Sequence, residues 1–216
     1  MKLQVKFFFI AGSILAVLGF VFRIFHLPGG GMASIVGLGS CAMSFMIEEL
    51  FQKSRFAIRL MNMGTAVLLI FILFRLQFWP GAMQMFIPGA IGSVVGIGLL
   101  LNSEKTDSPR LLPPAVVLCL AFSIAFIPAS KLYYFIHLNE PINSEYRKTD
   151  FQSWDKYSWF LYLEKHQDEA LKANDSAMNA YRLAPTNNHY PPFSDSLLQK
   201  HRAAIQQGNW KLYLTR

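Results

Sequence analysis

The stretch GFVFRIFHLPGGGMASIVG covers residues 19–37, and ILFRLQFWPGAMQMFIPG covers residues 72–89. In both, an apolar run reaches an arginine, a Pro-Gly pair follows, and a second apolar run begins. Arg23 and Arg75 are 52 residues apart, and the two Pro-Gly pairs keep the same offset. Two long apolar segments joined by a short turn are typical of a transmembrane helical hairpin. The repeated pattern predicts that the hairpin is duplicated in tandem.

Five segments are long and apolar enough for a transmembrane helix, which needs about 20 residues at a rise of about 1.5 Å each. They cover residues 5–25, 31–50, 57–78, 83–102 and 111–130. Each must be helical inside a bilayer, because its backbone N–H and C=O groups have no water to bond. Prolines bracket the fifth segment and leave it the shortest apolar core.

The sequence therefore predicts an all-α, polytopic membrane protein with a small soluble tail. We expect a first hairpin, a second hairpin, a linker with the fifth span, and a helical tail, at residues 1–52, 53–104, 105–138 and 139–216. In the tail, apolar residues recur at spacings near three and four from Phe151 to Ala184, with a break predicted around Asn174-Asp175. Ser194 resembles the N-cap of a further helix, and Gly208 resembles its stop.

Composition and charge support this fold class. The chain is 53% hydrophobic and 15% charged, which is too apolar for an ordinary soluble domain. The Lys and Arg residues between spans gather on one side, namely Lys2, Lys6, Lys53, Arg55, Arg59, Lys105 and Arg110. The positive-inside rule then predicts a cytoplasmic N-terminus and a tail outside the cytoplasmic membrane. No basic stripe interleaved with aromatic residues is present, so we expect no nucleic-acid partner.

Arg23 and Arg75 are the first candidate functional residues, because ionisable groups at membrane depth are costly and often functional. Both lie near the outward end of their spans. From there an arginine can snorkel to the interface or cap the carbonyls at its own helix C-terminus. The other interpretation is a role in ion conduction or in pairing with a partner. Conduction would need an acid at membrane depth, and the nearest are Glu48 and Glu49, at the cytoplasmic end of the second span.

Four further residues are candidates for packing or partner contacts. His26 lies in the first turn, and Trp79 in the second turn is a candidate interfacial anchor. Gly92 and Gly96 form a GxxxG pair, which permits close approach of another helix backbone. No metal-ligand spacing, phosphate loop, dinucleotide fingerprint or catalytic triad motif is recognisable. We therefore expect no enzyme activity, no cofactor and no metal.

The residues of the first turn carry a family resemblance. The pattern formed by Phe22, Arg23, Ile24, His26, Pro28 and Gly29, with the following MASIVGLGSCA, resembles the membrane hairpin of GldL, the gliding-motility and type 9 secretion family of Bacteroidota. It covers about residues 8–45 and, more loosely, 60–97. The resemblance implies a bacterial inner-membrane location, a proton-driven motor and a periplasmic partner. In that family an acid in the second helix works with the basic residue of the first. This chain has Cys41 and Ser93 at the two corresponding positions, so the motor carboxylate is missing.

Three hypotheses remain open from the sequence. The first is a non-catalytic membrane scaffold or accessory subunit of a cell-envelope complex, whose tail docks a membrane or periplasmic protein or a second copy of the chain. The second is an ion-conducting or motor-coupled subunit, in which Arg23 and Arg75 pair with acids on a partner. The third is a small-molecule transporter with its site between the two hairpins.

Overall fold

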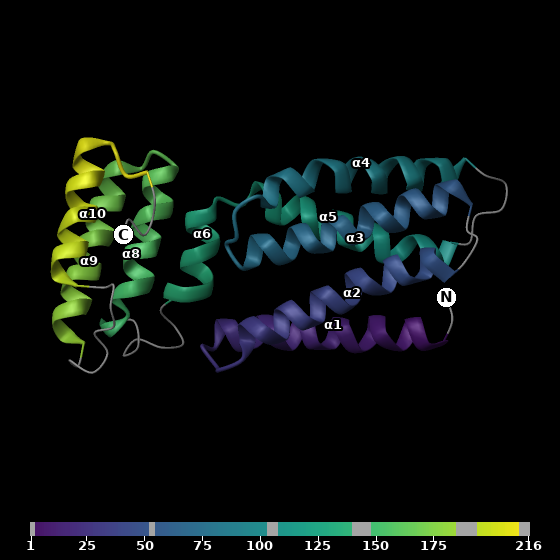
Figure 1. Ribbon diagram of the computed structural model, residues 1–216, viewed down its shortest axis with the longest axis horizontal. Helices are drawn as coiled ribbons and strands as arrows, with labels where there is room; N and C mark the ends of the chain where they lie inside the picture. The colour runs from purple at the N-terminus through teal and green to yellow at the C-terminus, as the bar shows by residue number, and fades with distance from the viewer. Residues whose placement is uncertain (1–2, 52–54, 103–107, 140–147, 185–193, 212–216) are drawn as a thin grey trace. The chain divides into compact units, whose positions relative to one another are not determined.

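The computed structural model describes residues 3–51, 55–102, 108–139, 148–184 and 194–211, and every regular element in them is helical (Figure 1). The all-helical fold class is therefore confirmed for these residues. The chain divides into two compact units. The first unit comprises residues 1–23 and 27–127, and the second comprises residues 24–26 and 128–216.

The first unit contains five helices: α1 (Leu3–Ile24), α2 (Gly30–Phe51), α3 (Phe56–Leu76), α4 (Ala82–Leu101) and α5 (Ser108–Phe126). They match the five expected segments to within a few residues, because turns and charged loops interrupt the apolar runs. Helices α1 to α4 are long and apolar enough to cross a membrane. Helix α5 is long and apolar enough to cross a membrane only when it is counted together with the helical segment Ala129–Leu138, which follows a bend of 108°.

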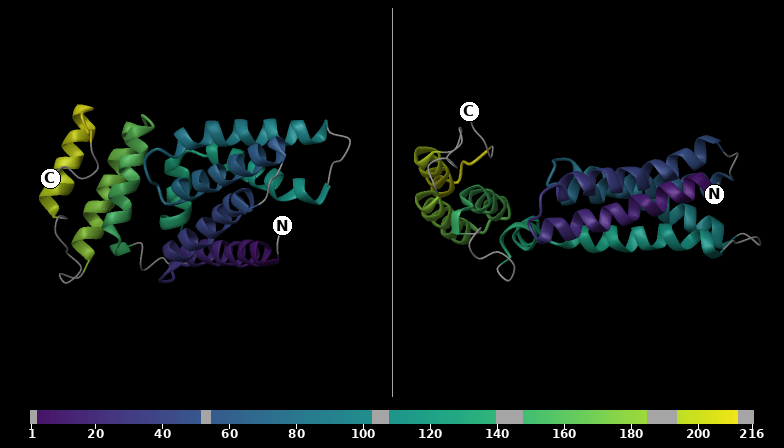
Figure 2. Two further views of the ribbon diagram at one scale, coloured as in Figure 1. Left: turned by 45° about the vertical axis from the view of Figure 1, so that its right-hand side comes forward. Right: turned by 90° about the horizontal axis from the view of Figure 1, so that it is seen from below.

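Helix α3 is the centre of the first unit. In its spanning segment 56% of the residues are buried, against 11% for α1. It packs against α2, α4 and α5, and α3, α4 and α5 lie side by side in all views (Figures 1 and 2). The rings of Phe71, Phe86 and Phe122 join these three helices, with 5.1 Å between the centroids of each successive pair.

The two helix pairs α1–α2 and α3–α4 share a close backbone contact at equivalent positions. A Cβ atom built on Gly12 would lie 2.9 Å from the carbonyl oxygen of Gly37. A Cβ atom built on Gly64, 52 residues later, would lie 2.9 Å from the carbonyl oxygen of Gly89. Only glycine allows helices to approach this closely, so the two pairs cross at equivalent residues.

The outer surface of the first unit is apolar. Large side chains with at least half of their surface exposed occur on all of α1, α2, α4 and α5, among them Phe7, Val17, Met32, Ile87 and Leu112. Exposed apolar area in water is unfavourable by roughly 25 cal/mol per Å². A surface of this kind indicates a lipid environment or a protein partner.

The second unit contains α6 (Ala129–Tyr133), the π-helical turn η1 (Tyr134–Leu138), α8 (Phe151–Leu163), α9 (Gln167–Leu183) and α10 (Asp195–Gln207). Helix α8 packs against α6, η1 and α9, and α10 packs against α9. The segment 129–138, which the sequence placed in the linker region, therefore belongs with the tail helices. The aromatic rings of Tyr133 and Phe160 lie 5.2 Å apart in this contact.

Small residues let α8 and α9 pack closely. Ser158 on α8 and Ala170, Ala173 and Ala177 on α9 are all buried. Leu161, Ile205 and Trp210 are buried in the core that includes Ala170 and Ala173. Partly buried tryptophan and tyrosine rings pack against this core. The tail thus has an aromatic-rich core of its own.

The predicted helix break around Asn174-Asp175 is wrong. Asn174 lies inside α9 and is fully buried, and the chain instead turns between α8 and α9, where Lys165 adopts a left-handed φ of 66°. Asn and Asp are common in turns because their side chains compete for backbone groups. Here Asn174 bonds to groups in the core. The expected third helix is confirmed, because Ser194 Oγ accepts a hydrogen bond from Leu197 N at 3.2 Å and Gly208 ends α10 with a φ of 68°.

Candidate functional site

The two Pro-Gly turns have nearly the same backbone conformation. Leu27 N donates to Phe22 O at 2.7 Å, and Trp79 N donates to Phe74 O at 2.9 Å, 52 residues later. These bonds are the 6→1 type that closes a helix C-terminus. They terminate α1 and α3, and the last turn of each helix contains an arginine, Arg23 or Arg75.

Each closing bond requires a left-handed residue, and neither turn uses glycine there. His26 has a φ of 52° and Phe78 has a φ of 56°. A non-glycine residue in this region costs about 1–2 kcal/mol. His26 and Phe78 occupy equivalent positions, so both turns contain the same unfavourable conformation. Contacts around each turn must therefore compensate for this conformational energy. His26 is half-buried, and Trp79 beside Phe78 is 43% exposed with its ring packed edge-on against Phe74.

Both arginines bond to the end of the next parallel helix. Arg23 Nη1 donates to the carbonyl oxygen of Leu76, the last residue of α3, at 2.7 Å. Arg75 Nη2 donates to the carbonyl oxygen of Ile127, immediately after α5, at 2.5 Å. The sequence led us to consider capping of the arginine's own helix, whereas the structure shows two guanidinium groups that connect α1 to α3 and α3 to α5.

The chemistry of these bonds is capping. The last carbonyls of a helix lack intrahelical donors and carry partial negative charge. A guanidinium is permanently protonated, and a carbonyl oxygen does not titrate in the ordinary pH range, so neither partner passes a proton. The side chains of Glu48 and Glu49 lie outside the described residues.

The glycine candidates on α4 differ in how tightly they pack. A Cβ atom on Gly96 would lie 2.4 Å from Met61 N of α3, which is far too close. A Cβ atom on Gly92 would lie 3.2 Å from the Cα of Gly64. The contact at Gly64 is as close as the contact at Gly96, because a Cβ atom on Gly64 would lie 2.3 Å from Ser93 N of α4. The contact between α3 and α4 therefore depends on Gly64 and Gly96 more than on Gly92.

Comparison of the chain with protein families, curated proteins and solved structures finds no match in any of the three. The resemblance to the GldL family stays a prediction.

Cys41 and Ser93, the two positions that the resemblance would align with a motor acid, are buried. Cys41 Sγ lies 3.4 Å from Ser13 Oγ in the first helix pair. Ser93 is fully buried in the second pair, and its hydroxyl has no hydrogen-bond partner among the described residues. Thr65, near this level, donates its hydroxyl to Met61 O at 2.8 Å on its own helix. These groups are small and neutral, so they fit a packed helix interior.

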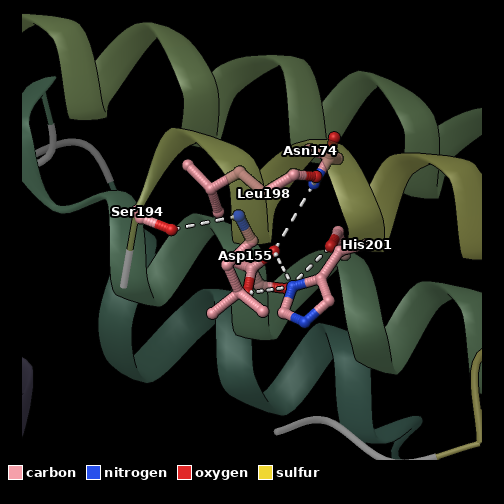
Figure 3. Close-up of polar contacts among 7 residues, drawn as sticks. Asp155, Asn174, Ser194, Leu198 and His201 are labelled. Atoms are coloured by element: carbon pink, nitrogen blue, oxygen red, sulfur yellow. Dashed lines mark hydrogen bonds and ion pairs between the residues drawn. The ribbon is translucent and has the colours of Figure 1, made fainter. Parts of the chain in front are cut away.

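The tail holds a buried polar network that the sequence analysis missed. His201 Nδ1 lies 3.0 Å and 2.9 Å from the two carboxylate oxygens of Asp155. Asn174 Nδ2 donates to Asp155 Oδ1 at 3.4 Å and to Leu198 O at 3.3 Å. Figure 3 shows these four residues pointing toward one another, from α8, α9 and α10. The side chains of the Asp155–His201 pair are 0% and 2% exposed, and the Trp210 ring stacks on the imidazole.

A signal for this network was present in the sequence. Asp155 lies four residues after the buried Phe151, Asn174 four after Ala170, and His201 four before Ile205. A polar residue on the apolar stripe of a helix predicts a buried polar contact. In the described residues no group of three or more His, Cys, Asp or Glu side chains is placed to hold a metal ion.

Asp150 gives a pH-dependent prediction for the tail. Its carboxylate caps α8 by accepting a hydrogen bond from Ser153 N at 3.0 Å, while burial raises the pKa of the carboxyl above its ordinary value. The folded tail therefore binds this proton more tightly than the unfolded chain. The resulting stabilisation is complete below the unfolded pKa and is lost as the pH rises through the folded pKa.

We expect Asp150→Asn, which keeps the cap without the charge, to equal or exceed the wild type in stability at pH 7. Asp150→Ala should cost about 1 kcal/mol, the usual value of an N-cap. Thermal unfolding of the full chain, followed by tryptophan fluorescence between pH 4 and 8, measures both. A wild-type tail that grows steadily more stable relative to Asp150→Asn as the pH rises would contradict the burial argument.

Proposed function

We propose that the chain is a non-catalytic integral membrane protein that acts as a scaffold or accessory subunit of a cell-envelope complex. The apolar outer surface of the first unit and its four helices of spanning length support the membrane assignment. The separate, aromatic-cored second unit supports a docking role for the tail. We infer that α5 is a fifth span, because Arg75 bonds its C-terminal end to the C-terminal region of α3.

The proposed location is the bacterial inner membrane, with a cytoplasmic N-terminus and a periplasmic tail. Exposed cations lie in the first turns or at the N-terminal ends of three helices: Lys6 on α1, Arg55 and Arg59 at α3, and Arg110 on α5. A cation at a helix N-terminus is opposed by the helix dipole, so helix stability does not explain these positions. The positive-inside rule does explain them.

One observation carries the choice of a structural role. Arg23 and Arg75 both bond to backbone carbonyls at helix ends. Such bonds are expected of arginines that stabilise the fold. The equivalence of the two helix pairs at an offset of 52 residues supports the duplication of one hairpin together with its arginine. The packing of α2 against α3, which joins the two helix pairs, also favours a packed bundle over a transport cavity between the hairpins.

Reporter fusions test the topology on which this function depends. A periplasm-active reporter fused after Ser103 should be inactive, and the same reporter fused after Arg216 should be active, because an odd number of spans separates the N-terminus from the tail. A cytoplasm-active reporter should give the reverse pattern. Equal activity of one reporter at both sites would show that α5 does not cross.

The docking role is tested with the full-length chain. Crosslinking in cells and extraction in mild detergent should recover a partner with the wild type, and recovery should fall when Asp155→Ala disrupts the tail. Monomer alone from the wild type, together with no phenotype on tail deletion, would overturn the proposal.

A further inference from the structure

Helix α1 exposes a face whose duplicate on α3 is buried. Four side chains of α1 are 37–63% exposed, namely Ile10, Ile14, Val17 and Val21. The four side chains of α3 that lie 52 residues later are only 2–8% exposed, namely Asn62, Ala66, Leu69 and Leu73. The same face of the duplicated helix is therefore covered in one copy and open in the other.

Neighbouring helices cover this face on α3. A helix turns by about 100° per residue, so the four buried positions share one side of α3. Gly64 and Leu68, which contact α4, lie on the opposite side. Besides α4, helices α2 and α5 pack against α3. The face is thus a helix–helix contact in the second copy, where it does not meet lipid.

The open face of α1 has the spacing of a helix that pairs with its own copy. Its four residues follow one another at intervals of four, three and four, and the exposed Phe7 extends the pattern by three residues. These intervals are those of the a and d positions that face each other in paired helices. No charged residue occurs from Phe7 to Phe22, so nothing on this face repels an identical helix.

We propose that α1 pairs with α1 of a second copy of this chain along Phe7, Ile10, Ile14, Val17 and Val21. Helix α1 lies at one edge of the first unit, beside α2, where a second helix can reach it (Figure 1). Two chains inserted in the same orientation are related by a two-fold axis along the membrane normal, so their α1 helices run parallel and present the same face to each other. The pairing rests on the membrane location proposed above and names a partner for it.

Disulfide crosslinking of the full-length chain in cell membranes tests the pairing. The background is Cys41→Ala/Cys119→Ala, and copper phenanthroline is the oxidant. Ile14→Cys and Val17→Cys should each give a crosslinked dimer, because identical a or d residues meet across the axis. Phe8→Cys is the matched control, since Phe8 is as exposed as these residues but lies about 150° around the helix from the centre of the face. The dimer yield at positions 14 and 17 should exceed the yield at position 8 several-fold.

A second measurement does not depend on cysteine variants. Single-molecule photobleaching of the tagged wild-type chain in lipid vesicles should show two bleaching steps per particle. Ile14→Ala/Val17→Ala should weaken the association by about tenfold or more, because the two-fold axis removes each contact twice. Phe8→Ala should leave the association unchanged.

Three results would overturn the pairing. Equal dimer yields at positions 8, 14 and 17 would mean that the chains meet by random collision. A monomeric wild type would mean that lipid covers the face, and crosslinks only to a chain of different mass would mean that another protein does. The reporter fusions test the membrane topology separately, so a chain that crosses the membrane as a monomer refutes the pairing alone.

Discussion

His201→Ala is expected to destabilise the tail by about 3–5 kcal/mol, the usual cost of removing one partner from a buried ion pair. The substitution leaves the carboxylate of Asp155 fully buried. Among the described residues, it would keep the long 3.4 Å side-chain contact from Asn174 in place of two short contacts to the imidazole. It also removes the ring that stacks on Trp210. Since a whole domain is stable by only about 5–15 kcal/mol, this loss should remove a large part of the tail's stability.

Denaturant unfolding of the full-length chain, followed by tryptophan fluorescence, measures this loss. The double variant Asp155→Ala/His201→Ala should lose less than the two single variants added together, because it leaves no charge unpaired. His166→Ala is the matched control. His166 and Glu169 are 3.8 Å apart and more than half exposed, and an exposed pair contributes almost nothing. A His201 variant as stable as the His166 variant would show that the pair is not buried in the folded protein.

The positions of the helices in the first unit could be predicted because each helix end is marked locally. Pro-Gly pairs and charged loops interrupt long apolar runs, and the expectation that these runs lie in lipid, where unpaired backbone groups are costly, predicts helix as their conformation. The end of α5 was harder to predict. Its apolar run continues through Pro128 into the segment 129–138, and only the contacts of that segment with α8 show that it belongs to the tail.

The partners of the arginines could not be predicted from the sequence. The sequence showed that Arg23 and Arg75 lie at helix ends, where carbonyls lack donors. Which helix supplies the carbonyl depends on the register between α1, α3 and α5, and that register is set by side-chain packing across the unit. The left-handed conformation of Phe78 is similar, because a bulky residue adopts it only when the surrounding turn compensates for the strain.

The buried network in the tail shows the limit of helix patterns in another way. The Asn174-Asp175 pair looked like a break because both residue types favour turns. In the structure the Asn174 side chain finds its acceptors on α8 and α10, so the helix continues through it. Long-range partners decided whether this polar residue ended a helix or entered the core, and the sequence does not show such partners.

Gly96→Ala should destabilise the packing of α3 against α4 by about 1–3 kcal/mol, the range for overpacking a tight contact, and Gly96→Leu by more. The added Cβ would lie 2.4 Å from Met61 N and 2.6 Å from Met61 Cα. These are backbone atoms, so the helices must separate and give up the contacts around Gly64. Thermal denaturation of the detergent-solubilised protein, scored as the fraction that stays monodisperse after heating, measures the effect.

Gly98 provides the control for this prediction, because it lies two residues away on the same helix with nothing within 4 Å of its Cβ position. Gly98→Ala should be neutral or stabilising by up to about 1 kcal/mol, since alanine favours helix over glycine. Gly92→Ala, with its nearest atom at 3.2 Å, should fall between the two. The order Gly98, Gly92, Gly96 thus follows the distance to α3. If Gly96→Ala were as stable as Gly98→Ala, the two helices would not meet along this seam, and the paired-hairpin architecture would lose its main packing contact.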